Sequence, residues 1–326
     1  MKNSIILSTG RYLPEKIIFN EDLTQFPASS LQLIAQKTGV LSRRHATEDQ
    51  CTSDLAIQSG RICLEKIDFP PEQVEAIIVS TASPDRVQPA TATRVQHLLG
   101  AEKAFAFDIN SSCSGSTLGI NLADSLIKSG RWKYILLIAA EMHSKIVNQK
   151  DFGTCPYFGD GSGAILFGVG DSSTRGILHS YMRTEGGKCD VAHIPGGGTM
   201  LPFSKMTDPA SAFLKMSGRS VYDFAVHRGS EIIGELLDQA GVSLEEVNCI
   251  VPHQANVNII RKIAENIGVA PDKFFTNLDR YGNTGSASVL IALDEAISKG
   301  VISRGDLVIT VAFGGGLSWG ANLIRI

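Results

Sequence analysis

The sequence predicts an α/β fold made of two similar halves, and three observations support this prediction. Short apolar runs alternate along the chain with longer segments of mixed polarity, as expected for buried strands and their connecting helices. A segment near residue 113 repeats near residue 283. Each repeat continues into a stretch that is poor in charge and rich in small residues, which is typical of a helix enclosed by its neighbours.

The repeat aligns residues 110–130 with residues 280–300 without a gap. The identical pairs are Gly115 with Gly285, Ser116 with Ser286, Asp124 with Asp294, Ile127 with Ile297 and Gly130 with Gly300. In this register Cys113 falls opposite Asn283. We expect the two enclosed helices to pack together, which brings these two residues close to one another at the helix N-termini.

Apolar runs flank both repeats in the same order. The predicted strands are residues 75–81 and 134–140 in the first half, and residues 247–253 and 306–312 in the second. We place the boundary near Gly170 and Asp171, which divides the chain into residues 1–170 and 171–326. Residues 145–225 are expected to be loop-rich and to cover a site or contact a partner.

Composition and charge narrow the functional classes. The 326 residues are 43% hydrophobic, and 30 basic against 33 acidic residues give a net charge of −3. This balance argues against a broad nucleic-acid or membrane surface. The N-terminus does not resemble a signal peptide and no apolar run is long enough to span a bilayer. We therefore expect a cytoplasmic protein without membrane insertion.

The six cysteines include no C-x-x-C pair, so we expect no metal site. An even number of cysteines is compatible with disulfides. The wide spacing and the absence of a signal peptide favour free thiols instead.

Cys113 lies where the predicted strand 105–109 meets an enclosed helix. Unpaired N–H groups and the positive end of a helix both lower the pKa of a thiol. The neighbouring residues are small, so a substrate can reach the sulfur. The position favours a nucleophile, and the alternative is an inert packing cysteine.

Two other polar residues stand at the ends of predicted elements. His253 ends the strand 247–253, and strand ends are where open α/β sheets place functional groups. Asn283 lies in a glycine-containing turn. Taken singly, the histidine could be structural and the asparagine could simply form the turn. The glycines of residues 313–320 would let the backbone approach a ligand closely.

Together these segments resemble the β-ketoacyl-acyl-carrier-protein synthase III family of the thiolase superfamily. The motifs that carry the resemblance are Leu7-Ser-Thr-Gly-Arg-Tyr-Leu-Pro-Glu, Lys37-Thr-Gly-Val, Ser112-Cys-Ser-Gly, Phe158-Gly-Asp-Gly-Ser-Gly-Ala, Pro252-His-Gln-Ala-Asn, Tyr281-Gly-Asn-Thr and Ala312-Phe-Gly-Gly-Gly-Leu-Ser-Trp-Gly. They extend over nearly the whole chain, and the order of the Cys, His and Asn motifs is highly specific. The resemblance implies the thiolase fold, an α/β fold with duplicated βαβ-containing halves in five αβαβα layers.

The resemblance also implies a role for each motif residue. Cys113 is the nucleophile that forms an acyl thioester, and the backbone N–H groups of Cys113 and Gly315 hold the oxyanion. His253 and Asn283 stabilise the enolate that forms when a malonyl-type thioester loses CO2. Phe313 presents an apolar face to the malonyl carboxylate. A degradative thiolase would need a second reactive cysteine near the C-terminus, which this chain lacks.

The chain departs from the family pattern at the mouth of the substrate tunnel. Leu33, Phe152 and Asn258 stand where members that are primed from coenzyme A usually have a Trp and arginines. The usual clamp on adenine and phosphate is therefore expected to be absent. This favours a carrier-protein-bound donor or a different pose of coenzyme A.

The expected substrate pocket also departs from the family pattern. Ser116, Gln88 and His143 stand where bulkier or more apolar residues are common. Smaller and more polar linings favour a longer or functionalised acyl group, and the alternative is an ordinary initiating synthase whose sequence has drifted. Glu141 and His143 are two apart on a strand and point the same way. They are either an extra base near the tunnel or a hydrogen-bonded structural pair.

The resemblance implies an acyl carrier protein as partner, a homodimer, and no bound cofactor, because acyl and malonyl thioesters of the carrier or of coenzyme A are the substrates. Arg261, Lys262 and Lys215 are candidates for docking the carrier protein. The alternative for all three is solvated surface charge.

The expected reaction is a decarboxylative Claisen condensation, in fatty-acid initiation or in specialised metabolism. One alternative is a non-condensing acyltransferase of the same fold, which passes the acyl group to an alcohol, an amine or a carrier. Another is a non-catalytic subunit that supports a partner synthase. The complete set of Cys113, His253 and Asn283 favours condensation, because simple transfer can proceed without an enolate-stabilising amide.

Overall fold

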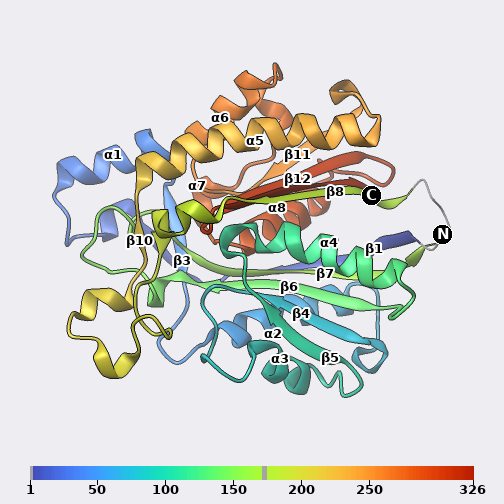
Figure 1. The fold of residues 1–326 in the computed structure, drawn as a ribbon, viewed down its shortest axis with the longest axis horizontal. Coiled ribbons are helices and arrows are strands. Elements are labelled where there is room, and N and C mark those ends of the chain that lie inside the picture. The colour runs from blue at the N-terminus through green and yellow to red at the C-terminus, as the bar shows by residue number, and fades with distance from the viewer. Residues whose placement is uncertain (1–2, 171–174) are drawn as a thin grey trace.

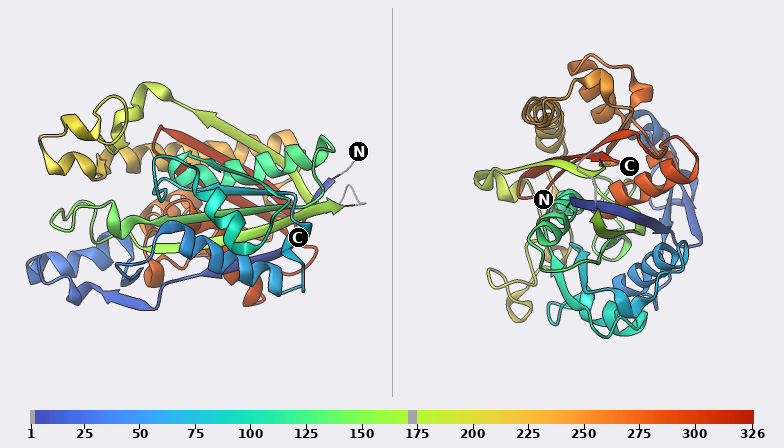
Figure 2. Two further views of the ribbon diagram at one scale, coloured as in Figure 1. Left: turned by 90° about the horizontal axis from the view of Figure 1, so that it is seen from below. Right: turned by 90° about the vertical axis from the view of Figure 1, so that its right-hand side faces the viewer.

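The computed structural model describes residues 3–170 and 175–326. Two sheets lie face to face with two helices between them, and further helices cover their outer faces (Figures 1 and 2). This arrangement confirms the predicted α/β fold with five αβαβα layers. The apolar core accordingly has three parts, one between the sheets and one beneath each outer helical layer.

The first sheet belongs to the N-terminal part of the chain. Its strands, in spatial order, are β1 (Asn3–Tyr12), β7 (Asp160–Gly170), β6 (Ile135–Met142), β4 (Ala76–Ser80) and β5 (Phe105–Ile109). Strand β4 is parallel to its neighbours β5 and β6, whereas β7 is antiparallel to both β6 and β1. Every residue of β4 and β6 is buried, which explains why these two segments are continuously apolar.

The second sheet has the same order of strands. It contains β11 (Cys249–Pro252), β12 (Leu307–Gly314), β13 (Ser318–Arg325) and β8 (Gly176–Thr184). Here β11 and β12 are parallel, and β13 is antiparallel to both β12 and β8. Where the first sheet has β5, the second has one parallel bridge between Ile250 and Phe274. The matching order agrees with an internal duplication.

The helices occupy matching places in the two halves. The outer helices are α2 (Thr52–Glu65) and α3 (Thr91–Leu99) on the first sheet, and α5 (Gly218–Ala240) and α6 (Val257–Asn266) on the second. The central helices α4 (Gly115–Lys128) and α8 (Ala287–Ser298) contact each other and both sheets. All residues of α8 from Ala287 to Ala296 are buried, as their charge-poor sequence predicts.

Smaller elements complete the described chain. They are α1 (Ala28–Thr38), α7 (Leu278–Tyr281), the strand pairs β2 (Lys16–Phe19) with β3 (Ser42–His45) and β9 (Ala192–His193) with β10 (Lys215–Met216), and 3-10 turns at Asn20–Asp22, Pro71–Gln73, Ser112–Ser114, His143–Lys145, Gly186–Val191, Phe203–Lys205, Pro209–Ala212, Leu244–Glu246 and Pro271–Lys273. Within residues 3–170 and 175–326, no helix combines the length and the apolar character of a bilayer span.

The prediction of a loop-rich segment over residues 145–225 was too broad. The long strands β7 and β8 lie inside it, and the irregular part extends from Glu185 to the start of α5. The glycines of β7 obscured the strand in the sequence. A Cβ at Gly163 would lie 2.6 Å from the Cβ of Leu290, so this glycine lets α8 pack against the sheet. Gly170 ends β7, and Asp171, at the predicted boundary, lies outside the described residues.

Candidate active site

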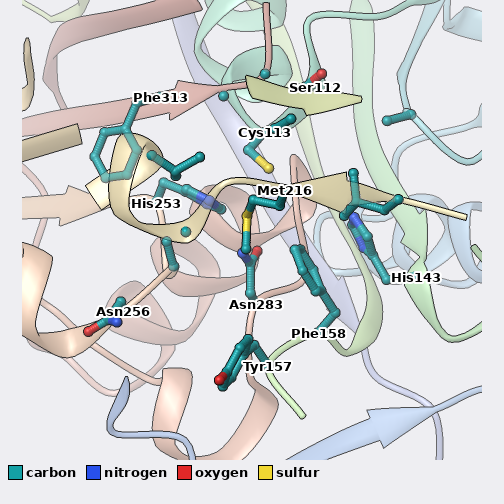
Figure 3. A pocket seen from close by; sticks show the side chains of 18 of the residues that line it. Ser112, Cys113, His143, Tyr157, Phe158, Met216, His253, Asn256, Asn283 and Phe313 are labelled. Atoms are coloured by element: carbon teal, nitrogen blue, oxygen red, sulfur yellow. The ribbon is translucent and has the colours of Figure 1, made fainter. Parts of the chain in front are cut away.

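A cavity of about 600 Å³ contains the three residues that the sequence analysis places at the reaction centre. Cys113, His253 and Asn283 all line it, and their side chains point into the same space (Figure 3). Exposed residues such as Lys37 and Gly153 form part of its rim. The histidine and the asparagine are buried, so the reactive groups lie inside the protein while the rim stays open to solvent.

Cys113 lies in the short turn between β5 and α4, and the backbone there is strained. Ser112 has a φ of 46°, a value that residues other than glycine rarely adopt. Its N–H donates to Oδ1 of Asn110 at 3.1 Å, which holds the turn in place. The turn directs the Cys113 side chain into the cavity instead of continuing the strand (Figure 3).

The glycine run after β12 packs directly against this turn. A Cβ at Gly314 would lie 2.7 Å from the backbone N of Cys113, and a Cβ at Gly315 would lie 3.2 Å from Oγ of Ser112. Only glycine allows so close an approach of two backbones. Cys113 and Gly315 both line the cavity, as residues of an oxyanion hole must. Their role in holding an oxyanion stays a prediction.

The pKa of the Cys113 thiol differs from the sequence-based expectation. Burial and, to a smaller extent, the nearby carboxylate of Glu141 together raise this pKa to about 12. The helix end was expected to lower it. The expectation was wrong because it counted the N–H groups near the sulfur but not the loss of water around it. In the resting cavity Cys113 is a neutral thiol.

His253 is held at the end of β11 by contacts on three sides. Its backbone N–H donates to the backbone carbonyl of Val311 at 2.7 Å, and its ring packs edge-on against Phe313 with 5.5 Å between ring centres. Nδ1 lies 2.7 Å from Oγ of Ser288 on α8. This hydroxyl also accepts from the N–H of Gln254 at 3.3 Å. When the hydroxyl donates its own proton to Nδ1, the remaining proton of the ring is on Nε2.

The protonation state of His253 follows from its burial. Loss of water and, to a smaller extent, the neighbouring His143 together lower its pKa to about 3. Its ordinary value is near 6.5, so the imidazole is neutral at any physiological pH. A neutral ring with its proton on Nε2 is a hydrogen-bond donor without a charge.

Asn283 is fixed by hydrogen bonds at every group except its side-chain NH2. Its N–H donates to the carbonyl of Tyr157 at 2.8 Å, and its carbonyl accepts from the N–H of Gly159 at 3.0 Å. Its Oδ1 accepts from the N–H of Gly285 at 2.9 Å. The amide orientation is therefore determined, and the Nδ2 donors remain for a ligand in the cavity.

Glu141 and His143 line the cavity, but the structure gives them different environments. The carboxylate of Glu141 accepts from Oγ of Ser83 and Oγ of Ser286, each at 2.7 Å, and from the N–H of Ala82. It therefore ties the end of β4 to the start of α8, which is a structural role. No hydrogen bond joins the two side chains in the described structure, so the interpretation as a hydrogen-bonded pair was wrong. The alternative, an extra base near the tunnel, stays a prediction. His143 stacks on Phe158 instead.

Two predicted pocket residues do not line the cavity. Ser116 is fully buried in the first turn of α4, and its hydroxyl has no partner among the described residues. It packs in the layer between the sheets, because α4 is enclosed from its first turn. Gln88 is exposed in the segment between β4 and α3. The two residues were assigned to the pocket from their matching positions in the family pattern. Such a match does not show which way a side chain faces, and both lie outside the cavity.

The predicted docking residues lie on β10 and α6, two elements that border the cavity. Lys215 is exposed and directly precedes Met216, which lines the cavity. Arg261 is exposed on α6, whose residue Ile259 also lines the cavity. Lys262 is half-buried and forms an ion pair with Glu265 at 2.9 Å, so its charge is partly neutralised.

The three residues that replace the expected coenzyme A clamp lie in segments that also border the cavity. Leu33 is partly exposed on α1, and Phe152 packs edge-on against Phe26 with 5.2 Å between ring centres. Asn258 donates from Nδ2 to the carbonyl of Lys37 at 2.8 Å. Asn258 therefore joins the end of α1 to the start of α6.

Sequence reasoning missed several residues of the site. Ser288 orients His253, Lys37 lies on the rim, and Met216 and Phe158 line the interior. Ser288 could have been found as the serine that follows the repeated Gly-Ser pair by two positions. Lys37 and Phe158 begin two of the motifs that carry the resemblance, but no role was assigned to either. Met216 had no signal, because its placement depends on a loop.

The six cysteines are free thiols. No group of three or more His, Cys, Asp or Glu side chains in the described parts of the chain has the geometry of a metal site.

Comparisons with known proteins assign the family. Residues 107–186 match the model of 3-oxoacyl-[acyl-carrier-protein] synthase III, and residues 237–326 match the model of the C-terminal part of the same enzyme. The chain belongs to this family. Its members are condensing enzymes of the thiolase fold, and this chain is one of them.

Relatives and solved structures agree over the full length. The chain is 42% identical to a β-ketoacyl-[acyl-carrier-protein] synthase III of Caldanaerobacter subterraneus, over 98% of this chain and 97% of the relative. It is similar to the crystal structure of the synthase III of Aquifex aeolicus, with a TM-score of 0.91, 38% identity, and coverage of 99% of this chain and 100% of the other. It is also similar to the priming β-ketosynthase of the R1128 polyketide pathway, with a TM-score of 0.91, 28% identity, and coverage of 99% and 97%.

Proposed function

We propose that Cys113 takes an acyl group from a thioester and that the protein then joins this group to a malonyl-type thioester with loss of CO2. The observation that supports this proposal is the convergence of one thiol and two uncharged donors in a single cavity, with Cys113, His253 and Asn283 contributed by separate elements.

In the first step, the sulfur of Cys113 attacks the carbonyl carbon of the donor thioester. A bond forms between that carbon and the sulfur, the bond to the carrier sulfur breaks, and the thiol proton leaves with the departing carrier. The pKa of about 12 means that the nucleophile is a thiol at rest. The backbone N–H groups of Cys113 and Gly315 stabilise the negative charge only as it develops on the carbonyl oxygen.

In the second step, a malonyl-type thioester loses CO2 and its remaining electron pair forms an enolate. The enolate oxygen accepts hydrogen bonds from Nε2 of His253 and Nδ2 of Asn283. Its carbon attacks the acyl carbonyl, a carbon–carbon bond forms, and the Cys113 sulfur leaves and takes up a proton. Phe313, packed on the His253 ring, supplies an apolar surface that disfavours the carboxylate relative to neutral CO2. Each donor of this kind contributes about 10²–10³ in rate.

The proposed donor is an acyl group on a carrier protein. Lys215 and Arg261 are exposed positive charges on elements that border the cavity, and an acidic carrier protein would dock against them. Leu33, Phe152 and Asn258 offer no cationic clamp for the phosphates of coenzyme A. We further propose a homodimer and a cytoplasmic location, and a duplication whose halves are residues 1–170 and 171–326. The carrier protein and coenzyme A enter as substrates, with no bound cofactor.

Intact-mass spectrometry tests the first step. The protein is incubated with acyl-carrier thioesters or with acetyl-coenzyme A, and the mass of the acyl adduct is measured over time. We expect an adduct that Cys113→Ala abolishes and that the matched control Cys189→Ala, at an exposed thiol, retains. We also expect acyl-carrier donors to react faster than acetyl-coenzyme A.

Addition of malonyl-carrier thioester then tests the second step, with CO2 release and a 3-oxoacyl product as the expected result. An adduct without CO2 release would instead identify a non-condensing acyltransferase. No adduct from any donor would identify a non-catalytic subunit. Equal or faster labelling by acetyl-coenzyme A would contradict the proposed donor but not the condensation.

A further inference from the structure

His143 is a cavity residue for which the proposed reaction has no task. It follows β6 directly and begins the turn His143–Lys145. Its side chain is only 4% exposed, and what remains exposed faces the cavity that also contains Cys113 (Figure 3). Its Nδ1 is buried and has no hydrogen-bond partner among the described residues. An imidazole left unpaired inside a protein is unfavourable, and most such groups have a partner.

The packing around His143 prevents the ring from turning away to find a partner. One face stacks on Phe158, with 4.7 Å between ring centres and 22° between the ring planes. Near the ring edge lies Gly285, where a Cβ would overlap Cε1 of His143. Side chains and backbone therefore hold the ring where it is. Because Nδ1 is sealed off, Nε2 is the ring nitrogen that a molecule in the cavity can reach.

His143 lies close to the residues that carry the reaction. It contacts the turn that carries Asn283, through Gly285. It is near enough to His253 to influence the charge on that ring. An acyl group held on Cys113 therefore extends into a space that is also bordered by His143.

We propose that His143 donates a hydrogen bond from Nε2 to an oxygen on the acyl group, close to the thioester, and that the preferred substrates are acyl groups with a hydroxyl or oxo oxygen there. This inference rests on the proposed function, since it assigns the substrate class of the same site. No acceptor lies beside the sealed Nδ1 among the described residues, so a proton there would be an unsatisfied donor, and the neutral ring carries its proton on Nε2. The preferred ligand atom is therefore an acceptor, and oxygen at an early carbon of the acyl chain supplies it.

A pair of matched substrates tests the proposal. The values of kcat/KM are measured for 3-hydroxybutyryl and butyryl thioesters of the same carrier protein, with each enantiomer of the hydroxy compound. We expect the wild type to prefer one hydroxybutyryl enantiomer over butyryl. In His143→Leu, which keeps the size but removes the donor, this preference falls by about tenfold or more. In His143→Gln, which retains an N–H donor, part of the preference is recovered.

The matched control is His97→Leu, at an exposed histidine on the outer helix α3, which should leave the preference ratio unchanged. A wild type without preference for either hydroxybutyryl enantiomer overturns the inference. So does a His143→Leu variant that lowers kcat/KM for both substrates by the same factor, because that pattern means a positioning role. If butyryl still labels Cys113 in these cases, the proposed function stands. If no thioester labels Cys113, both proposals fall.

Discussion

The two turns that precede the central helices are matched in the repeat and begin alike, but their backbone conformations then differ. Ser112, before the nucleophile, has a φ of 46°, and its counterpart Gly282 has a φ of 64°. Three residues later the halves diverge, because Gly115 has a φ of −60° and continues into the helix while Gly285 has a φ of 56°. The second turn is therefore one bend longer before its helix begins.

This difference separates two tasks. In the first half, the early helical turn leaves Cys113 at the end of the central layer, with its sulfur facing the cavity. In the second half, the extra bend lets the N–H of Gly285 bond back to Oδ1 of Asn283, which fixes the amide. A nucleophile must reach its substrate, whereas a hydrogen-bond donor must be held still. Both halves share a turn followed by a helix. The φ of the glycine at position 115 or 285 decides which of the two needs the turn serves.

The largest expected effect comes from removing the nucleophile. In Cys113→Ala, condensation should fall below detection, because no acyl-enzyme forms. Release of CO2 from malonyl-carrier thioester should persist at a measurable rate, since His253 and Asn283 remain in place. Product analysis and CO2 release, measured in parallel, check this separation of tasks. Loss of both activities to the same extent would mean that the two turns do not act separately.

The complementary change is Asn283→Ala. Removing one enolate donor should lower the rate of CO2 release by about 10²–10³. Acylation of Cys113 by an acyl-carrier donor should change far less, because that step uses the backbone N–H groups. Single-turnover labelling measured by intact mass, beside CO2 release, gives the comparison. A loss of labelling as large as the loss of CO2 release would contradict the assignment of Asn283 to the second step.

Much of the fold was predictable because two signals extend over the whole chain. The register between residues 110–130 and 280–300 predicted the halves, and the charge-poor helices predicted the central layer. The strand β7 was hidden because it contains several glycines, of which Gly161 and Gly163 make room for α8. The counterpart of β5 is reduced to a single bridge at Phe274, which no pattern in the sequence distinguishes from a strand.

The site was predictable where a motif names a residue and less so where packing decides. Cys113, His253 and Asn283 meet in the cavity because strand ends and helix starts converge there. The thiol pKa depends on water excluded by both halves, so the local helix end alone predicted the wrong direction. Ser116 and Gln88 were assigned to the cavity by position, but whether a side chain faces a cavity depends on the surrounding layers.

A pair of glycine substitutions sharpens the comparison between the turns. Gly285→Ala should lower the free energy of unfolding by about 2 kcal/mol or more, since its positive φ disfavours a side chain and the new Cβ would overlap the His143 ring. Gly115→Ala should cost less than about 1 kcal/mol, because its φ is helical and only the hydroxyl end of Ser80 must move. Urea denaturation of both variants measures the difference. Equal losses would mean that the backbone conformation does not distinguish the two positions.

The smallest expected effect concerns pH. Because burial lowers the pKa of His253 to about 3, the ring stays neutral well below its ordinary titration range. The rate of CO2 release should therefore change by less than about twofold between pH 6 and pH 8, whereas a histidine with the ordinary pKa near 6.5 would be mostly protonated at pH 6. Initial rates with saturating malonyl-carrier thioester measure this. A rate of CO2 release that changes with pH, with a midpoint near pH 6.5, would show that His253 is accessible to water in the working enzyme.

The same depressed pKa makes a prediction about stability with a definite sign. Between about pH 3 and pH 6.5 the unfolded chain binds a proton at His253 and the folded chain does not, so protonation favours unfolding as the pH falls. This one residue should contribute a loss of up to about 1.4 kcal/mol per pH unit in that window. Urea denaturation at pH 6.5 and pH 5.5 measures the slope, and His253→Gln, which cannot titrate there, is the matched control. A slope that is equal in the two proteins would mean that the imidazole is not buried as the structure places it.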